Sequence, residues 1–224
     1  MREIVFDTET TGLDPASGDR LVEIGCVEIL NRIPTGRTFH RYINPERDMP
    51  DAAFAVHGLS ASFLEDYPVF AEIAADFMDF IEDVPLIAHN ADFDMKFINA
   101  ELGRLGFPAL SKSRVIDTLG MARQKFPGAP ATLDALCKRF NIDNSSRTRH
   151  GALLDSELLA EVYLELTGGR QVGLALLAED RRTASGRQQG EKSFRAPRPH
   201  QPSAEELAAH DAFMSGIKDP VWDA

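Results

Sequence analysis

The chain is short of cysteine and of long apolar runs, and each shortage excludes a class of protein. Only Cys26 and Cys137 occur among 224 residues, which excludes a disulfide framework and indicates a reducing compartment. No apolar run approaches the roughly 20 residues that cross a bilayer. Because the first residues are already strand-like, we also expect no signal peptide and no association with a membrane.

Positive charge is scarce as well. There are 24 Lys and Arg against 35 Asp and Glu, a net charge of −11, whereas a general nucleic-acid binder should be basic. This objection weakens if several acids bind divalent cations, because bound Mg²⁺ or Mn²⁺ would reverse the local field and attract phosphate. We then expect weak nucleic-acid binding unless a partner delivers the substrate.

The composition, 43% hydrophobic and 26% charged, is ordinary for one sizeable globular domain with a tail. Alternating and continuous apolar runs predict five strands, and apolar stripes at helical spacing predict the helices between them. The order predicts an α/β fold, a mixed sheet of about five strands with helices on both sides. The expected strands are 4–8, 21–29, 38–45, 84–89 and about 114–117, and the expected helices are about 60–82, 91–106, 131–140 and 152–167, with one more after the fifth strand.

Two acids share one face of the first strand. Asp7 and Glu9 are two residues apart, so both side chains leave the same side. A solvated edge strand would explain the pair, but the flanking residues Ile4, Val5 and Phe6 are typical of a core. Buried carboxylates are costly unless positive charge compensates them.

Two further acids lie on the apolar stripes of two predicted helices. Asp94 aligns with Phe97 and Ile98, and Asp155 aligns with Leu158 and Leu159, so both carboxylates should point inward. Buried salt bridges are the alternative, but no Lys or Arg sits on either stripe. Hard divalent cations with oxygen ligands are therefore the expected compensation.

One histidine completes the set. His150 precedes Asp155 by five residues, about 500° of helical turn, so the two cannot share a helix face and His150 should lie in the loop RTRHG. A surface histidine is the plain interpretation of His150 alone. Beside four acids, its ordinary pKa of about 6.5 suits a general base. The combination is typical of two-metal phosphodiester hydrolysis.

The blocks FDTET, HNADFD and HGALLD resemble the three motifs of the DEDDh family of 3′→5′ exonucleases, whose fold is RNase H-like. The resemblance covers residues 1–170, and it is nearest to the epsilon (proofreading) subunits of bacterial DNA polymerase III. It implies that Asp7, Glu9, Asp94 and Asp155 hold two Mg²⁺ or Mn²⁺ ions and that His150 deprotonates the attacking water. The implied products are 5′-nucleoside monophosphates, released stepwise from a DNA 3′ end.

The same resemblance implies a set of substrate-binding residues around the 3′ end. Gly12 would let the backbone approach the terminal nucleotide, and Val56, His57 and Phe93 would form the wall against its base. His57 fits a structural turn histidine equally well. Ala52 departs from the pattern, since some relatives carry an acid there. The implied set comprises Asp7, Glu9, Gly12, Ala52, Val56, His57, Asn90, Phe93 and Asp155.

The character of the chain changes after Gly168. Residues 171–202 are rich in Gly, Ser, Pro and Gln, which predicts a flexible linker. A last helix should begin at Ser203 with Glu206 closing a capping box, within a C-terminal segment 203–224. The apolar residues of this segment, which we expect to dock on a partner groove, are Leu207, Phe213, Met214, Ile217 and Trp222.

The tail also carries implications of the resemblance. Residues 171–176, with Gln171, Leu174 and Leu176, resemble a clamp-binding peptide, or else they simply extend the preceding helix. Residues 203–224 resemble the segment that docks on the polymerase III alpha subunit. The implied partners are therefore DNA, the alpha subunit and the sliding clamp, in the bacterial cytoplasm at the nucleoid and replisome. Two alternatives stay open: an RNA-trimming DEDDh exonuclease, and a mainly structural polymerase subunit.

Overall fold

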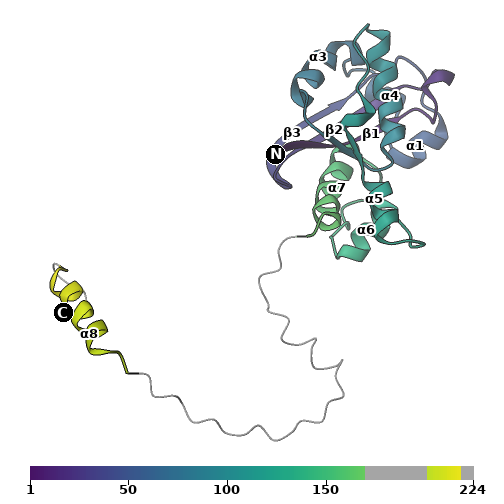
Figure 1. Cartoon of the computed structure of the whole chain (residues 1–224). Helices are drawn as coiled ribbons and strands as arrows, with labels where there is room; N and C mark the ends of the chain where they lie inside the picture. Colours follow the sequence, from purple (N-terminus) through teal and green to yellow (C-terminus); the bar gives the residue numbers. More distant parts are fainter. Residues whose placement is uncertain (170–200, 218–224) are drawn as a thin grey trace, which may run out of the picture. The chain divides into compact units, whose positions relative to one another are not determined.

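The computed structural model describes residues 1–169 and 201–217 (Figure 1). The chain divides into two compact units, residues 1–174 and 175–224. The second unit contributes one described helix. The expected clamp-binding peptide, 171–176, and Trp222 lie outside the described residues.

A five-stranded mixed sheet forms the centre of the first unit, as the sequence predicts. Its order is β3-β2-β1-β4-β5, with β1, β2 and β3 an antiparallel meander and β4 and β5 parallel to β1. The third strand begins five residues earlier than expected. The strands are β1 (Arg2–Thr10), β2 (Leu21–Leu30), β3 (Ile33–Tyr42), β4 (Leu86–Ala88) and β5 (Val115–Asp117).

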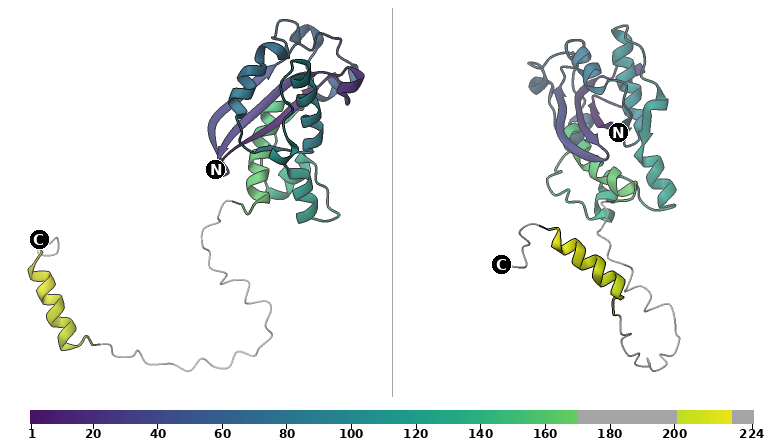
Figure 2. Two further views of the ribbon diagram at one scale, coloured as in Figure 1. Left: turned by 45° about the horizontal axis from the view of Figure 1, so that its top comes forward. Right: turned by 60° about the vertical axis from the view of Figure 1, so that its left-hand side comes forward.

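Helices cover both faces of this sheet, in agreement with the expected layers (Figures 1 and 2). The structure adds a helix that periodicity misses, α1, which follows Pro50 and ends at Gly58 with φ of 76°. The single helix expected over 60–82 is two helices, because Pro68 interrupts it. The helices are α1 (Asp51–His57), α2 (Ala61–Leu64), α3 (Phe70–Ile81), α4 (Ala91–Arg104), α5 (Thr118–Lys125), α6 (Leu133–Phe140) and α7 (Ala152–Leu166), with 3-10 turns at Pro15–Ser17 and Lys112–Arg114.

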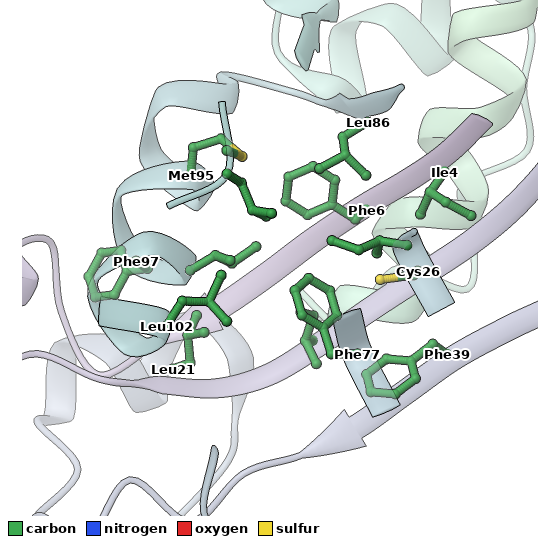
Figure 3. Packing of buried hydrophobic residues seen from close by; sticks show 14 of the residues in the cluster. Ile4, Phe6, Leu21, Cys26, Phe39, Phe77, Leu86, Met95, Phe97 and Leu102 are labelled. Atoms are coloured by element: carbon green, nitrogen blue, oxygen red, sulfur yellow. The ribbon is translucent and has the colours of Figure 1, made fainter. Parts of the chain in front are cut away.

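Alternate side chains of β1 point to opposite faces of the sheet, into two separate hydrophobic cores. Ile4 and Phe6 point into the core shared with α3 and α4, which Figure 3 shows at close range. Val5 points into the second core, beneath α5, α6 and α7. Asp7 and Glu9 have the parity of Val5 and therefore leave the strand on the side of α7.

Gly25 on β2 allows α7 to approach the sheet closely. A Cβ atom at this position would lie 2.3 Å from the backbone of Ala152 and Leu153. The hydroxyl of Ser156 donates a hydrogen bond of 2.9 Å to the Gly25 carbonyl. Gly25 pairs with Asp7 across the strands, so this contact sets where α7 begins relative to the two acids.

The second unit contains α8 (Ala204–Ser215), which begins with the expected capping box of Ser203 and Glu206. Phe213 is 69% exposed and Leu207 is 48% exposed. The helix is less amphipathic than we expect from its apolar face, because its remaining positions include Ala208, Ala209 and Ala212. No helix of the described ranges is both long and apolar enough to cross a bilayer.

Replacing Gly25 with Ala should destabilise the protein by about 1–3 kcal/mol, because the added methyl group has no space without moving α7. Gly103→Ala is the matched control: Gly103 lies in α4 and a Cβ atom there would meet nothing within 4 Å. This control should raise stability by about 0.5–1 kcal/mol. Urea unfolding of both variants measures the difference, and equal stabilities would contradict the close approach.

Candidate active site

The four predicted acids converge at the carboxyl end of β1. Asp7 and Glu9 come from β1 and Asp94 from the first turn of α4. Asp155 lies in the first turn of α7. Glu9, Asp94 and Asp155 are buried. Ligand atoms of Glu9, His150 and Asp155 lie within 4.8 Å of one another.

Crowding changes the proton affinity of these acids. Burial raises the pKa of Asp7 well above its usual range, and the charges of Asp94, Glu9 and Asp155 raise it further. Burial raises the pKa of Glu9 to about 8, helped by the facing Glu23 of β2. Burial and mutual repulsion therefore both disfavour the ionised acids unless a cation is bound among them.

Asp94 is held in place by Thr8. The Thr8 hydroxyl donates a hydrogen bond of 2.7 Å to Oδ1 of Asp94, which joins α4 to β1. Burial raises the pKa of Asp94 to about 7, although this hydrogen bond acts in the opposite direction. Thr8 belongs to the FDTET block, but its role was not predicted.

His150 lies in the loop before α7, as expected from its spacing. Its backbone N–H donates to the Val56 carbonyl at 3.3 Å, which fixes the loop against α1. The imidazole Nδ1 lies 3.4 Å from Oδ2 of Asp155, and the side chain is 49% exposed. The ring therefore reaches both a metal-ligand candidate and solvent.

The structure corrects one expectation: a cation does pair with a predicted metal ligand. Arg147 donates from Nε and Nη2 to the two oxygens of Asp155, at 2.6 and 2.7 Å. Its Nη1 donates to Asp134 at 2.9 Å, and its Nη2 lies 2.9 Å from Nδ1 of His150. Arg147 comes from the loop rather than from a helix stripe, so helical periodicity could not reveal it.

One arginine does not neutralise four acids. Arg147 lowers the pKa of Asp7 and of Glu9, but both stay raised. A carboxylate offers about four lone-pair directions, so the Arg147 fork leaves Asp155 able to bind a further cation. An all-carboxylate donor set is what Mg²⁺ and Mn²⁺ prefer, and the residues therefore fit divalent metal ions.

Asp117 fixes the helix that carries Asp94. Its Oδ1 accepts from the backbone N–H of Asn90 at 2.9 Å and of Leu119 at 3.1 Å, while its Oδ2 accepts from Gly120 at 3.2 Å. One carboxylate thus caps the starts of both α4 and α5. Asn90 takes a left-handed conformation, with φ of 64°. Sequence alone gave no signal for this double cap.

A cavity of about 640 Å³ adjoins the acids on the side of α1. It brings together every residue that the family resemblance implies for the 3′ end except Asp155, and it adds the exposed Leu13. Asp155 lines the opposite side of the site. The predicted residues in this cavity are Asp7, Glu9, Gly12, Ala52, Val56, His57, Asn90 and Phe93.

Gly12 and His57 have contacts within the protein that bear on their predicted roles. A Cβ atom at Gly12 would lie 2.3 Å from the carboxylate of Asp19, so packing alone requires glycine there. His57 accepts at Nδ1 from the backbone N–H of Leu59, at 3.0 Å, as a turn histidine does. Its buried Nε2 has no hydrogen-bond partner among the described residues, and the ring lines the cavity.

Comparison with known proteins identifies the family of the chain. The family model described as "Exonuclease" matches residues 4–163. The epsilon subunit of DNA polymerase III from Rickettsia felis is 53% identical over 222 residues, with 97% of each chain covered. The epsilon subunit from Escherichia coli K12 is 44% identical over 231 residues, covering 97% of this chain and 93% of that protein.

Solved structures with the same fold are more distant in sequence. Exonuclease X, in complex with 5′ overhanging duplex DNA, is 22% identical with a TM-score of 0.59, over 74% of this chain and 90% of that one. The nuclease domain of 3′hExo, a DEDDh family member bound to rAMP, is 18% identical with a TM-score of 0.62, over 74% and 91%. These likenesses establish the RNase H-like fold. The chain therefore belongs to the exonuclease family, among the epsilon subunits of DNA polymerase III, and is a 3′→5′ exonuclease.

Proposed function

We propose that this chain hydrolyses DNA from the 3′ end by two-metal catalysis and so removes mispaired nucleotides during replication. The convergence of four acids at the end of β1 carries the proposal, and burial together with the neighbouring charges raises the pKa of Asp7, Glu9 and Asp94 there. A mispaired end frays more readily than a paired one into a single-strand site, and this difference would supply the selectivity.

Asp7, Glu9, Asp94 and Asp155 would hold two Mg²⁺ or Mn²⁺ ions. Bound there, the ions supply an activated water and stabilise charge on the attacking and leaving oxygens. Thr8 and Arg147 orient two of these carboxylates through the hydrogen bonds described above. Supporting partners of this kind fix the geometry of metal ligands.

His150 would take the proton from the attacking water. Its Nδ1 lies 3.4 Å from Asp155, while the exposed side of the ring can pass the proton to solvent. Arg147 lies against the ring, with its Nη2 2.9 Å from Nδ1, and so holds the imidazole beside Asp155.

The α1-side cavity would hold the terminal nucleoside. Val56 and Phe93 offer apolar surface to the base, and Gly12 offers a backbone wall. The Nε2 of His57, which has no hydrogen-bond partner among the described residues, would donate to an acceptor on that nucleoside. Ala52 leaves room where some relatives place an acid.

The tail would carry the exonuclease to its partners. The apolar side chains of this segment would dock on the polymerase III alpha subunit. They are Leu207 and Phe213, exposed on α8, the half-buried Met214 and Ile217, and Trp222. Gln171, Leu174 and Leu176 would contact the sliding clamp. A tether of this kind raises the local concentration of exonuclease at the primer end. Such a subunit works in the bacterial cytoplasm, at the replisome.

His150→Gln should lower kcat on single-stranded DNA by about 10²–10⁴-fold, because it removes the general base. Binding of Mn²⁺, followed by electron paramagnetic resonance, should stay within about twofold of the wild type. Asp7→Asn, in contrast, should lose both activity and Mn²⁺ binding, whereas His210→Gln on exposed α8 should change neither. Unchanged turnover in His150→Gln would remove the histidine from the mechanism. Assaying matched RNA beside DNA decides between the two substrates.

Without metal, ionising the acids should destabilise the fold as pH rises. Glu9 ionises near pH 4.5 when unfolded but at about 8 when folded, so stability is full below pH 4.5 and is lost towards pH 8. Because the buried His57 and the half-buried His89 have lowered pKa values and act in the opposite sense, the comparison is between variants. The Tm of the wild type minus that of Glu9→Gln should fall by several degrees from pH 5 to pH 8 in EDTA, and Mn²⁺ should reverse the fall. A constant difference would contradict the metal site.

Deleting residues 203–224 should abolish co-purification with the alpha subunit while leaving exonuclease activity on free single strands within about twofold. The reason is that the four acids of the site and His150 lie in the first unit. The double change Leu207→Ala and Phe213→Ala should weaken alpha binding in the full-length chain, and Ala208→Ser on the same helix is its control. Normal binding by the truncated chain would place the docking surface elsewhere.

A further inference from the structure

A second cavity, of about 700 Å³, opens on the other side of the four acids. It lies against α5, α6 and the loop before α7. Both cavities are lined by Asp7, His89, Asn90 and His150. The acids and His150 therefore stand between two spaces of similar size, each within the range of a small-molecule site.

The two cavities differ in charge. The α1-side cavity is lined by no Lys or Arg among the described residues. The α5-side cavity is lined by Arg123 and Arg147, together with apolar surface from Leu119, Ala129 and Ala131. A space with apolar walls and guanidinium groups suits a nucleotide, whose base is apolar on its faces and whose phosphate is an anion.

Of the two arginines in this cavity, Arg123 is the one without a partner among the described residues. Arg147 is committed to Asp134 and Asp155. Arg123 is exposed and forms no ion pair or side-chain hydrogen bond within the part of the chain that the structure describes. Arg123 and His89 line the same cavity, and the charge of Arg123 adds to burial in lowering the pKa of His89.

The path of the bound DNA strand follows from the proposed function, on which this inference rests. If the terminal nucleoside fills the α1-side cavity, the scissile phosphate lies at the acids. The rest of the strand must then continue away from that cavity. The α5-side cavity is the adjoining space, and the next phosphate upstream must pass its walls.

We propose that the α5-side cavity is a second nucleotide subsite, in which Arg123 binds the phosphodiester immediately upstream of the scissile one. Arg123 is then a substrate-binding residue that acts on polynucleotides. A mononucleotide ester carries no phosphate upstream of the scissile one and cannot make this contact. In a chain of net charge −11, such a local cation allows an acidic protein to hold a polyanion.

The test compares two substrates in the full-length chain with Mn²⁺: the p-nitrophenyl ester of thymidine 5′-monophosphate, and a ten-residue oligothymidylate. Arg123→Gln should lower kcat/KM on the oligonucleotide about tenfold or more, mainly through KM, and so lower the ratio of oligonucleotide to ester activity by a similar factor. The slope of log Kd against log salt should fall by about 0.7 for one lost phosphate contact. Lys138→Gln is the matched control, since Lys138 is exposed on α6 and does not line the cavity.

A neutral linkage makes the test specific to one phosphate. An oligothymidylate with a single methylphosphonate at the linkage upstream of the scissile one should be a poorer substrate for the wild type, and Arg123→Gln should add little further loss. The subsite would be overturned if the wild type cleaved the methylphosphonate substrate as well as the unmodified one. It would also be overturned if the losses from the methylphosphonate and from Arg123→Gln multiplied as independent effects do. Inactivity of the wild type on both substrates would instead overturn the proposed function, and the subsite with it.

Discussion

Mutual repulsion among four acids at the end of one strand is the constraint on which the rest of this structure depends. β1 contributes Asp7 and Glu9, and two helices bring Asp94 and Asp155 against them. Placing like charges together in a buried site is unfavourable unless cations are added. Arg147 supplies one positive charge and lowers the pKa of Asp7, but burial and the other three acids keep that pKa raised. The arrangement is therefore more favourable when cations are bound among the acids than when the protein is alone.

Contacts outside the acids hold the arrangement. The missing side chain of Gly25 lets α7 lie close to the sheet, and Asp117 caps the starts of α4 and α5 together. Thr8 then joins α4 to β1. The first two contacts fix backbone and the third fixes a carboxylate directly, so the acids are placed before any ligand arrives. Such preorganisation is what electrostatic catalysis requires.

Charge is distributed to suit a polyanionic substrate even though the whole chain is acidic. The α1-side cavity is lined by no Lys or Arg among the residues described, and it suits a nucleoside; Arg123 and Arg147 line the α5-side cavity. In the proposed reaction the strand would cross from one to the other over the acids. The overall charge of −11 then limits binding away from this path, which suits an enzyme tethered to its substrate by a partner.

Periodicity and spacing revealed the five strands, both helix-borne acids and the loop position of His150, because these depend on local geometry: alternation in a strand and 3.6 residues per turn in a helix. The same reasoning missed α1, too short to show a stripe, and extended one helix across Pro68. It could not find Arg147, because this residue approaches Asp155 from a loop and not from a helix face. It also could not find the role of Asp117, because the backbone groups that this residue caps belong to two different helices. Both depend on where the chain returns in space. That position is set by packing between distant segments, so only the folded structure decides it.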